Sequence, residues 1–190
     1  MKSTLLAVAL IAATSAAHAA PEKYSLDPGH SQIVFTYGHL GFSTATGMFS
    51  GFEGNITFDG ENPANSSVSV SMPVLSMLTG WEARFDHIMA DDFFGAKEGD
   101  LITFTSTSID VTGEKTAEIT GDLTMNGVSK PVVLDAVMNQ MGMHPMAKME
   151  WAGFSATTTV LRSDFGLGAF APYVSDELDV TISIEAVKDE

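Results

Sequence analysis

The chain has 190 residues, of which 24 are acidic and 9 basic, and its net charge is −15. So acidic a surface repels nucleic acid and anionic membrane faces, which excludes nucleic acid from the expected partners. The sequence contains no cysteine, so disulfide bonds and thiolate chemistry are excluded and stability must come from packing and hydrogen bonds.

The first residues are predicted to be a cleaved secretory signal. Lys2 supplies a positive charge, residues 5–13 are mostly apolar, and Ala17-His18-Ala19 has the A-x-A pattern of a cleavage site. The apolar run is shorter than the roughly 20 residues that a membrane span requires. We therefore predict a signal peptide at residues 1–19, a mature domain at residues 20–190, a periplasmic location and no stable membrane insertion.

After residue 24 apolar and polar residues alternate, as they do in strands with one buried face. Turn-forming pairs separate the alternating runs, and Asn126-Gly127 is a strong signal for a two-residue hairpin. The predicted strands lie at residues 32–37, 54–58, 68–72, 102–105, 119–125, 132–137, 154–160 and 180–186. Short strands at regular intervals favour one all-β domain, an antiparallel sandwich or barrel.

One segment has the periodicity of a helix. Its apolar side chains recur at positions i, i+4, i+7 and i+8, which are Trp81, Phe85, Ile88 and Met89. Thr79 and Glu82 have the spacing of a capping box, with Thr79 as the N-cap. We predict a short helix near residues 80–90 that lies across an opening or an edge of the sheet.

Motifs spread along most of the mature chain resemble one known family. They occur in the order Tyr24–Ser31, His39–Ser43, Thr79–Phe94, Ile102–Thr107, Gly121–Val132, Gly153–Ala156 and Arg162–Gly166. In sequence and order they resemble the YceI-like family, whose members are described as periplasmic polyisoprenoid-binding proteins. One departure is Phe85, which follows Arg84 where the family usually has aspartate.

The resemblance implies a lipocalin-like antiparallel barrel of about eight strands with one short helix. It also implies a cavity that holds a long-chain isoprenoid, or a quinone-like or similar amphipathic lipid, for periplasmic transport or storage. We expect no enzymatic activity, no cofactor and no catalytic residues. Barrels of this kind can also pair through an exposed strand edge, so a homodimer belongs to the expected partners.

The candidate ligand-binding residues are of two kinds. Aromatic side chains of the alternating runs are candidates for the cavity lining, with ordinary core packing as the alternative: Phe35, Tyr37, Phe42, Phe49, Phe58, Phe104 and Phe154. Arg84 and Arg162 are candidates for a phosphate headgroup, because a guanidinium binds phosphate through two hydrogen bonds. The alternative is that they pair with acidic neighbours, Asp86 or Asp92 and Asp164 respectively. His87 is predicted to lie at the barrel mouth.

Two further groups of residues bear on catalysis and on metal binding. His30 and Ser31 are sequence neighbours, and in a strand they point to opposite faces, which is poor geometry for a base and its nucleophile. Methionines and one histidine are concentrated in Met138–Met149, and thioether and imidazole ligands suit Cu(I). A periplasmic Cu(I)-binding protein is therefore the alternative function, although methionine also suits a lipid-binding surface.

Overall fold

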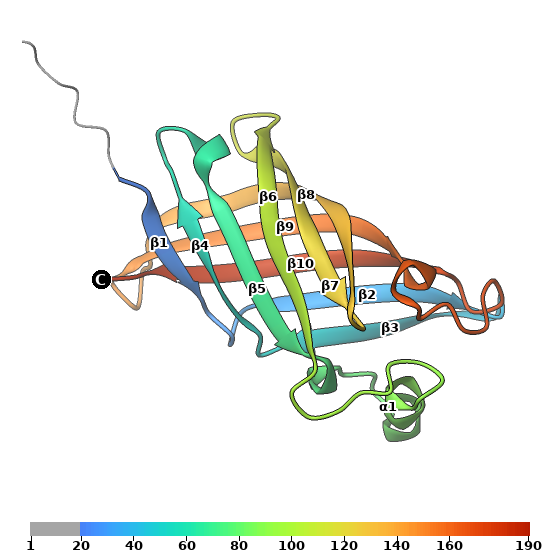
Figure 1. The fold of residues 1–190 in the computed structure, drawn as a ribbon. Coiled ribbons are helices and arrows are strands. Elements are labelled where there is room, and N and C mark those ends of the chain that lie inside the picture. The colour runs from blue at the N-terminus through green and yellow to red at the C-terminus, as the bar shows by residue number, and fades with distance from the viewer. Residues whose placement is uncertain (1–19) are drawn as a thin grey trace, which may run out of the picture.

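A computed structural model describes residues 20–190, so the predicted signal peptide lies outside the described residues. Within residues 20–190 all strand pairings are antiparallel, and the sheet curves into a barrel with a single α-helix, α1 (Glu82–Met89), beside it (Figure 1). The strands are β1 (Glu22–Leu26), β2 (Gln32–His39), β3 (Ser43–Ser50), β4 (Glu53–Phe58), β5 (Ser67–Pro73), β6 (Leu101–Val111), β7 (Thr116–Met125), β8 (Val128–Met143), β9 (Glu150–Leu161) and β10 (Glu177–Lys188). Short 3-10 helices occur at Pro63–Asn65, Val74–Ser76 and Arg162–Phe165.

The barrel closes because β1 pairs with both β4 and β10. β1 and β2 follow one another along the same edge of β10, since Leu26 faces Ala186 and Gln32 faces Ser183. β3 and β4 likewise form one strand that is interrupted at residues 51–52. The segments of the sheet thus form an eight-stranded barrel, and the predicted fold class is confirmed.

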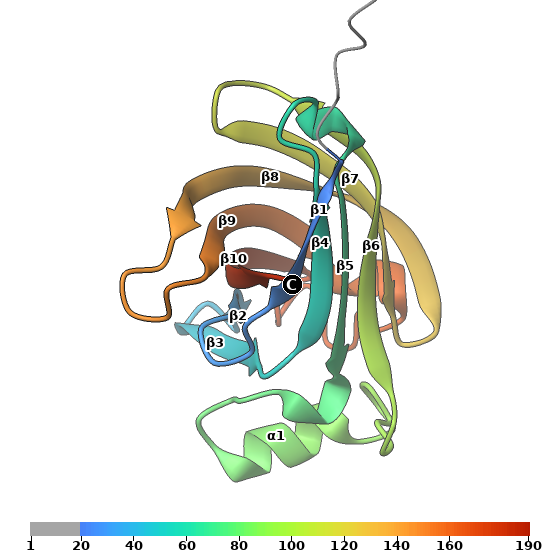
Figure 2. The ribbon, with the colours of Figure 1, turned by 90° about the vertical axis from the view of Figure 1, so that its left-hand side faces the viewer.

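β3 and β4 differ in the strand pairing on their outer edges. β4 pairs with β5, whereas β3 has an isolated bridge, between Met48 and Leu78, as its contact on the side away from β2. The chain that follows Leu78 turns into α1, which lies beside the barrel between the end of β5 and the start of β6 (Figure 2). The helix therefore lies where the barrel wall has an unpaired strand edge, as the sequence led us to expect.

The helix begins differently from the prediction. Its N-cap is Trp81, and the hydroxyl of Thr79 donates a 2.9 Å hydrogen bond to the Trp81 carbonyl. Gly80 has φ +75°, a left-handed conformation that separates Thr79 from the first helical turn. The predicted capping box is therefore wrong, although the helix itself is confirmed within residues 80–90.

Each of the eight predicted strands is confirmed, and the structure has two further strands that were not predicted. β1 and β3 were not predicted, because Glu22–Leu26 is short and Ser43–Ser50 is largely small and polar. The Asn126-Gly127 hairpin is confirmed, with φ values of 52° and 71° at the two turn residues. Among the described residues, no helix is long and apolar enough to cross a membrane.

Cross-strand rows show how the interior is built, since directly paired residues lie on the same face of the sheet. In one row, Met141, Ala152, Ala186 and Leu26 face one another across β8, β9, β10 and β1, and we name this set the packed row. Nearer the middle of the same strands, Ala136, Ala156, Ile182 and Ile33 form a second set, which we name the cavity row. In the packed row Ala186, Ala152 and Leu26 are 0%, 1% and 7% exposed, and Met141 is partly buried against them.

A candidate lipid-binding cavity inside the barrel

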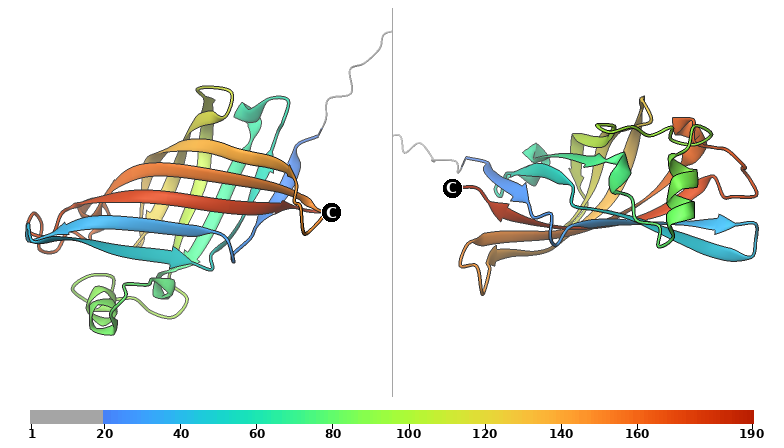
Figure 3. Two further views of the ribbon diagram at one scale, coloured as in Figure 1. Left: turned by 180° about the vertical axis from the view of Figure 1, so that it is seen from behind. Right: turned by 90° about the horizontal axis from the view of Figure 1, so that it is seen from below.

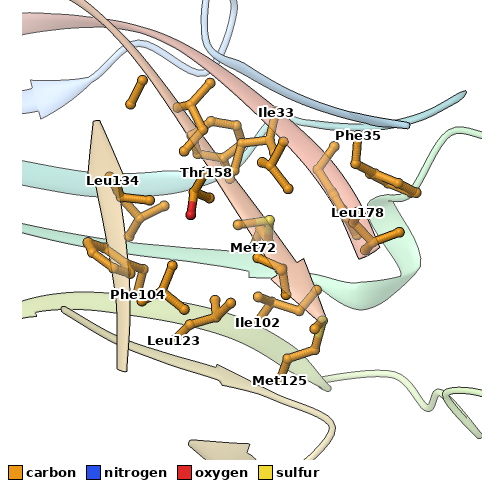
Figure 4. A pocket seen from close by; sticks show the side chains of 18 of the residues that line it. Ile33, Phe35, Met72, Ile102, Phe104, Leu123, Met125, Leu134, Thr158 and Leu178 are labelled. Carbon is orange, nitrogen blue, oxygen red and sulfur yellow. The ribbon is translucent and has the colours of Figure 1, made fainter. Parts of the chain in front are cut away.

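The barrel encloses a cavity of about 1060 Å³. Most of its wall consists of aliphatic, methionine and aromatic side chains, and Figure 4 shows Ile33, Met72, Ile102, Leu123, Leu134 and Leu178 around the empty centre. Small-molecule sites usually measure about 300–1,000 Å³, so this volume lies just above that range. A small barrel can fill itself with side chains, whereas this one leaves room for a large apolar guest.

Two glycines let aromatic rings lie flat against the wall. A Cβ atom at Gly47 would lie 2.1 Å from the ring of Phe35, and one at Gly121 would lie 2.4 Å from the ring of Phe104. Phe35 is paired with Gly47 across β2 and β3, so its ring covers the glycine. The glycines therefore keep both rings near the wall, which leaves the centre of the barrel open.

Polar groups are few in the middle of the cavity and more frequent at its ends. Ser155 and Thr158 on β9 belong to the lining, and the Thr158 hydroxyl is visible in Figure 4. At one end the lining includes Ser66, Glu114 and Lys115, from the β4–β5 and β6–β7 loops. At the end near α1 it includes further polar side chains, namely His39, Arg84, His87, Arg162 and Tyr173. Cationic groups thus gather mainly at the α1 end.

Arg84 and His87 lie on α1 and line this end of the cavity. Arg84 donates a 3.1 Å hydrogen bond from Nη1 to the Thr79 carbonyl, and it forms no ion pair with a carboxylate of residues 20–190. His87 lies 3.4 Å from Asp92, with its ring against Phe93. The suggested pairing of Arg84 with Asp86 or Asp92 is therefore not found, and Asp92 contacts His87 instead.

Arg162 is 8% exposed, and its guanidinium forms hydrogen bonds with backbone carbonyls rather than with acidic side chains. Its guanidinium donates to the carbonyls of residues 167, 169, 174 and 175, at 2.5 to 3.3 Å. Burial lowers the pKa of this guanidinium, while the charges of Asp176 and Tyr37 act in the opposite direction. Four of its five N–H donors are thus used to hold the segment 166–176 at the mouth of the cavity, and the suggested pair with Asp164 is not found.

The aromatic candidates fall into two groups. Phe35, Tyr37, Phe49, Phe58, Phe104 and Phe154 all line the cavity. Phe42 does not, because it lies in the turn between β2 and β3 and is 90% exposed. Leu40 and Phe42 continue the apolar pattern beyond β2, so the sequence did not show that this strand ends at His39. Contact of any of these residues with a ligand remains a prediction.

Sequence reasoning missed lining residues of two kinds. Aliphatic ones such as Leu134 and Ile182 belonged to alternating runs, and only the choice of aromatic side chains left them out. Leu40, Phe170 and Tyr173 come from turns and from the irregular segment 166–176, where no periodic pattern points to the cavity. Their position depends on the bonds of Arg162, which the sequence does not reveal.

The methionines of Met138–Met149 lie in different surroundings. Met138 lines the cavity and Met141 packs against the core, whereas Met143 and Met146 are 61% and 86% exposed on the β8–β9 hairpin. His144 accepts hydrogen bonds at Nδ1 from the backbone N–H groups of Met146 and Ala147. These two hydrogen bonds occupy the lone pair of Nδ1. The arrangement thus gives the Cu(I) alternative no support.

Asp27, His30 and Glu185 form a small cluster where the chain passes from β1 to β2 beside β10, with potential ligand atoms within 4.8 Å of one another. His30 Nδ1 lies 2.5 Å from Asp27 Oδ2, and this hydrogen bond raises the pKa of His30 and lowers that of Asp27. Ser31 is buried and bonds instead to the backbone of Glu185, donating to its carbonyl and accepting from its N–H. His30 and Ser31 are therefore not arranged as a base and its nucleophile.

Comparison with known proteins gives one family. The YceI-like domain family matches residues 24–186. A UPF0312 protein of Pseudomonas putida (strain GB-1) is 40% identical over 191 residues, covering 99% of this chain and 98% of its own length. A UPF0312 protein of Photorhabdus laumondii is 38% identical over 193 residues and covers 100% of both chains.

Solved structures share the barrel. The YceI protein of Campylobacter jejuni has a TM-score of 0.72 at 31% identity, covering 80% of this chain and 90% of its own. BcnA of Burkholderia cenocepacia has a TM-score of 0.75 at 23% identity, covering 84% and 98%. A polyisoprenoid binding domain from Saccharophagus degradans has a TM-score of 0.68 at 16% identity, covering 87% and 98%. The last two, at this identity, show the fold alone.

Proposed function

The chain belongs to the YceI-like family, and from that premise we propose that it binds a long-chain isoprenoid or similar amphipathic lipid inside its barrel. The role we propose is transport or storage of this lipid in the periplasm, as a binding protein rather than an enzyme. The observation that carries the proposal is the cavity of about 1060 Å³, whose centre is lined by apolar side chains. A structural neighbour that is named as a polyisoprenoid binding domain supports the choice of ligand class.

The energetics favour an apolar chain as the guest. Burial of one methylene group is worth about 0.8 kcal/mol, so a chain of several isoprene units gains many kcal/mol when it leaves water. Ordering a flexible chain offsets part of this gain. An apolar wall makes few directional contacts, so selectivity for one lipid must come from the length of the cavity and from the polar groups at its ends.

We assign the headgroup to the α1 end. Arg84 lines the cavity there with one hydrogen bond to a carbonyl, so most of its N–H donors remain for an anionic or polar headgroup. His39 and His87 are exposed at the same end and can donate or accept hydrogen bonds. Arg162 supports this end through its bonds to backbone carbonyls, and we assign it no contact with the ligand.

Mass spectrometry of the protein purified from its native periplasm tests the proposal. Native spectra give the mass of the complex, and organic extraction identifies what was bound. We expect one long-chain isoprenoid, or a lipid of similar size, bound to each protein molecule. Protein that carries no lipid and that takes up none when isoprenoids are added would contradict the proposal.

A further inference from the structure

We propose that the α1 end of the barrel is a docking surface for a lipid bilayer, through which the ligand enters and leaves the cavity. This inference rests on the proposed function and adds a partner to the same site. It follows from six apolar side chains, which we name the apolar rim: Leu40, Phe42, Leu78, Trp81, Phe170 and Tyr173. Their exposed fractions run from 50% at Leu40 to 90% at Phe42.

The rim comes from three segments around the opening of the cavity. The turn between β2 and β3 and the segment 166–176 lie together at one tip of the barrel, as Figures 1 and 3 show. The chain just before α1 lies beside β3, where Leu78 pairs with Met48. The Leu40 N–H donates a 2.7 Å hydrogen bond to the Tyr173 carbonyl. The ring of Phe170 lies 5.8 Å from that of Phe93, just beyond α1. Exposed aromatic side chains are therefore held in place by a connected framework.

The backbone holds two rim residues in an unfavourable conformation. Leu40 and Phe170 have φ values of 55° and 63°, and a bulky side chain with positive φ is rare because Cβ crowds the backbone. Among residues 20–190, the other non-glycine residues with positive φ are Asn126 and Lys148. Strain of this kind persists where the surrounding structure requires it, and it is frequent at functional positions. Its occurrence at two exposed apolar residues of the rim points to a use for them.

The rim is continuous with the cavity. Leu40, Trp81, Phe170 and Tyr173 also line the cavity, so the same side chains contact its interior and the solvent. A lipid that moves from a bilayer into a carrier through water must expose its methylene groups on the way. If the rim touches the bilayer, the chain can slide along apolar surface from one to the other.

The chemistry of the rim suits a bilayer. Tryptophan and tyrosine have an apolar ring and a polar tip, which places them favourably at the boundary between lipid and water. The charges around the rim are mainly negative, with Glu82, Asp86, Asp91 and Asp92 near Arg84. These carboxylates are repelled by anionic headgroups. The occupant that fits is therefore a zwitterionic lipid surface, bound through apolar contact.

Vesicles of phosphatidylcholine test the proposal with the mature protein. We expect the protein to sediment with the vesicles, and Trp81 emission to shift to shorter wavelength in a Trp151→Phe background. The test variant is Phe42→Ser, since Phe42 does not line the cavity and its loss leaves the binding interior intact. The matched control is Met146→Ser, at an 86% exposed position on the β8–β9 hairpin, at the opposite end of the barrel (Figure 3).

We expect Phe42→Ser to reduce vesicle binding about tenfold, as loss of one inserted aromatic side chain implies, and Met146→Ser to leave it unchanged. Added phosphatidylglycerol should weaken binding at low salt. A fluorescent polyprenol delivered from vesicles should enter Phe42→Ser more slowly, whereas the same probe added from ethanol should bind it as it binds the wild type.

Three results would overturn the docking surface. The first is a wild-type protein that binds the ethanol-delivered probe but ignores vesicles, which leaves the proposed function standing. The second is equal loss of vesicle binding in both variants. The third is a wild-type dimer, seen by light scattering, that Phe42→Ser disperses without change in vesicle binding, because the rim would then face a second copy. Failure of the probe to bind by either route would overturn the proposed function itself.

Discussion

The packed row and the cavity row share strands β8, β9 and β10 and face the same interior, yet only one of them is filled. In the packed row, Leu26 lies against Ala186 and Ala152, and these three side chains are at most 7% exposed. In the cavity row, Ile182 and Ile33 lie beside Ala156 with the same cross-strand pairing, but they face the cavity. The alternating pattern decides which side chains point inward. Whether these side chains are packed depends on whether side chains from the opposite wall of the barrel reach them.

The difference follows from what lies across the barrel. Tyr24, two residues from Leu26 on β1, is 2% exposed and belongs to the same buried core as Leu26, Ala152 and Ala186. Farther along, the rings of Phe35 and Phe104 cover glycines of the neighbouring strands and stay near the wall. The two rows have similar sequence patterns but different roles: the packed row stabilises the fold, and the cavity row leaves space for a ligand.

Truncation of one residue in each row should produce the largest difference. We expect Leu26→Ala to lower the free energy of unfolding by about 2–5 kcal/mol, because it leaves a void in a filled region. Ile182→Ala should cost about 1–2 kcal/mol in the ligand-free protein, because its side chain already faces empty space. Urea denaturation measures both. Equal costs would mean that the two rows are packed alike.

Adding a methyl group, instead of removing side-chain atoms, should also cost more stability in the filled region than beside the cavity. A Cβ atom at Gly54 would lie 2.4 Å from the Ser69 carbonyl and 3.1 Å from Leu26, so Gly54→Ala should cost about 1–3 kcal/mol. At Gly47 the obstacle is the Phe35 ring, which can swing into the cavity. We expect Gly47→Ala to cost less stability but to reduce lipid uptake. Thermal melting and probe titration separate the two effects, and uptake by Gly47→Ala equal to that of the wild type would argue against an open centre.

Arg84 and Arg162 offer a comparison within the mouth. Arg84→Gln should weaken binding of an isoprenyl phosphate about tenfold, since a hydrogen bond to a charged group is lost, and should spare the neutral alcohol. Arg162→Gln should instead destabilise the fold and change the affinities for both ligands alike, because its donors hold carbonyls of residues 167–175. Titration with the two lipids distinguishes these roles. An Arg84→Gln protein with unchanged selectivity would remove the arginine from the headgroup site.

The smallest effect concerns pH. The hydrogen bond to Asp27 raises the pKa of His30 above 6.5, so its stabilising contribution is present below pH 6.5 and is lost as pH rises through the raised pKa. The lowered pKa of Asp27 makes its contribution present above pH 3.8 and lost as pH falls through that lowered value. NMR titration should show the His30 pKa return towards 6.5 in Asp27→Asn. A His30 pKa that does not change would mean that the pair is absent in solution.

Much of the fold was predictable from residue patterns, whereas the cavity inside it was expected from the family resemblance alone. Alternation located most strands, and the spacing from Trp81 to Met89 located the helix. The packed and cavity rows, however, share the same pattern, so alternation could not separate filled from hollow regions. The exposed position of Phe42 and the role of Arg162 depend on where a strand stops and on an irregular segment, and neither leaves a periodic signal.

Two variants on β9 test whether the hollow interior holds the lipid. Ala156 and Thr157 are neighbours on β9, with Ala156 lining the cavity and Thr157 exposed on the outer face. Each is replaced by phenylalanine, folding is checked by circular dichroism, and bound isoprenoid is counted by native mass spectrometry. We predict that Ala156→Phe loses most of its lipid and that Thr157→Phe keeps it. Equal lipid occupancy in the two folded variants would mean that the hollow interior does not hold the lipid.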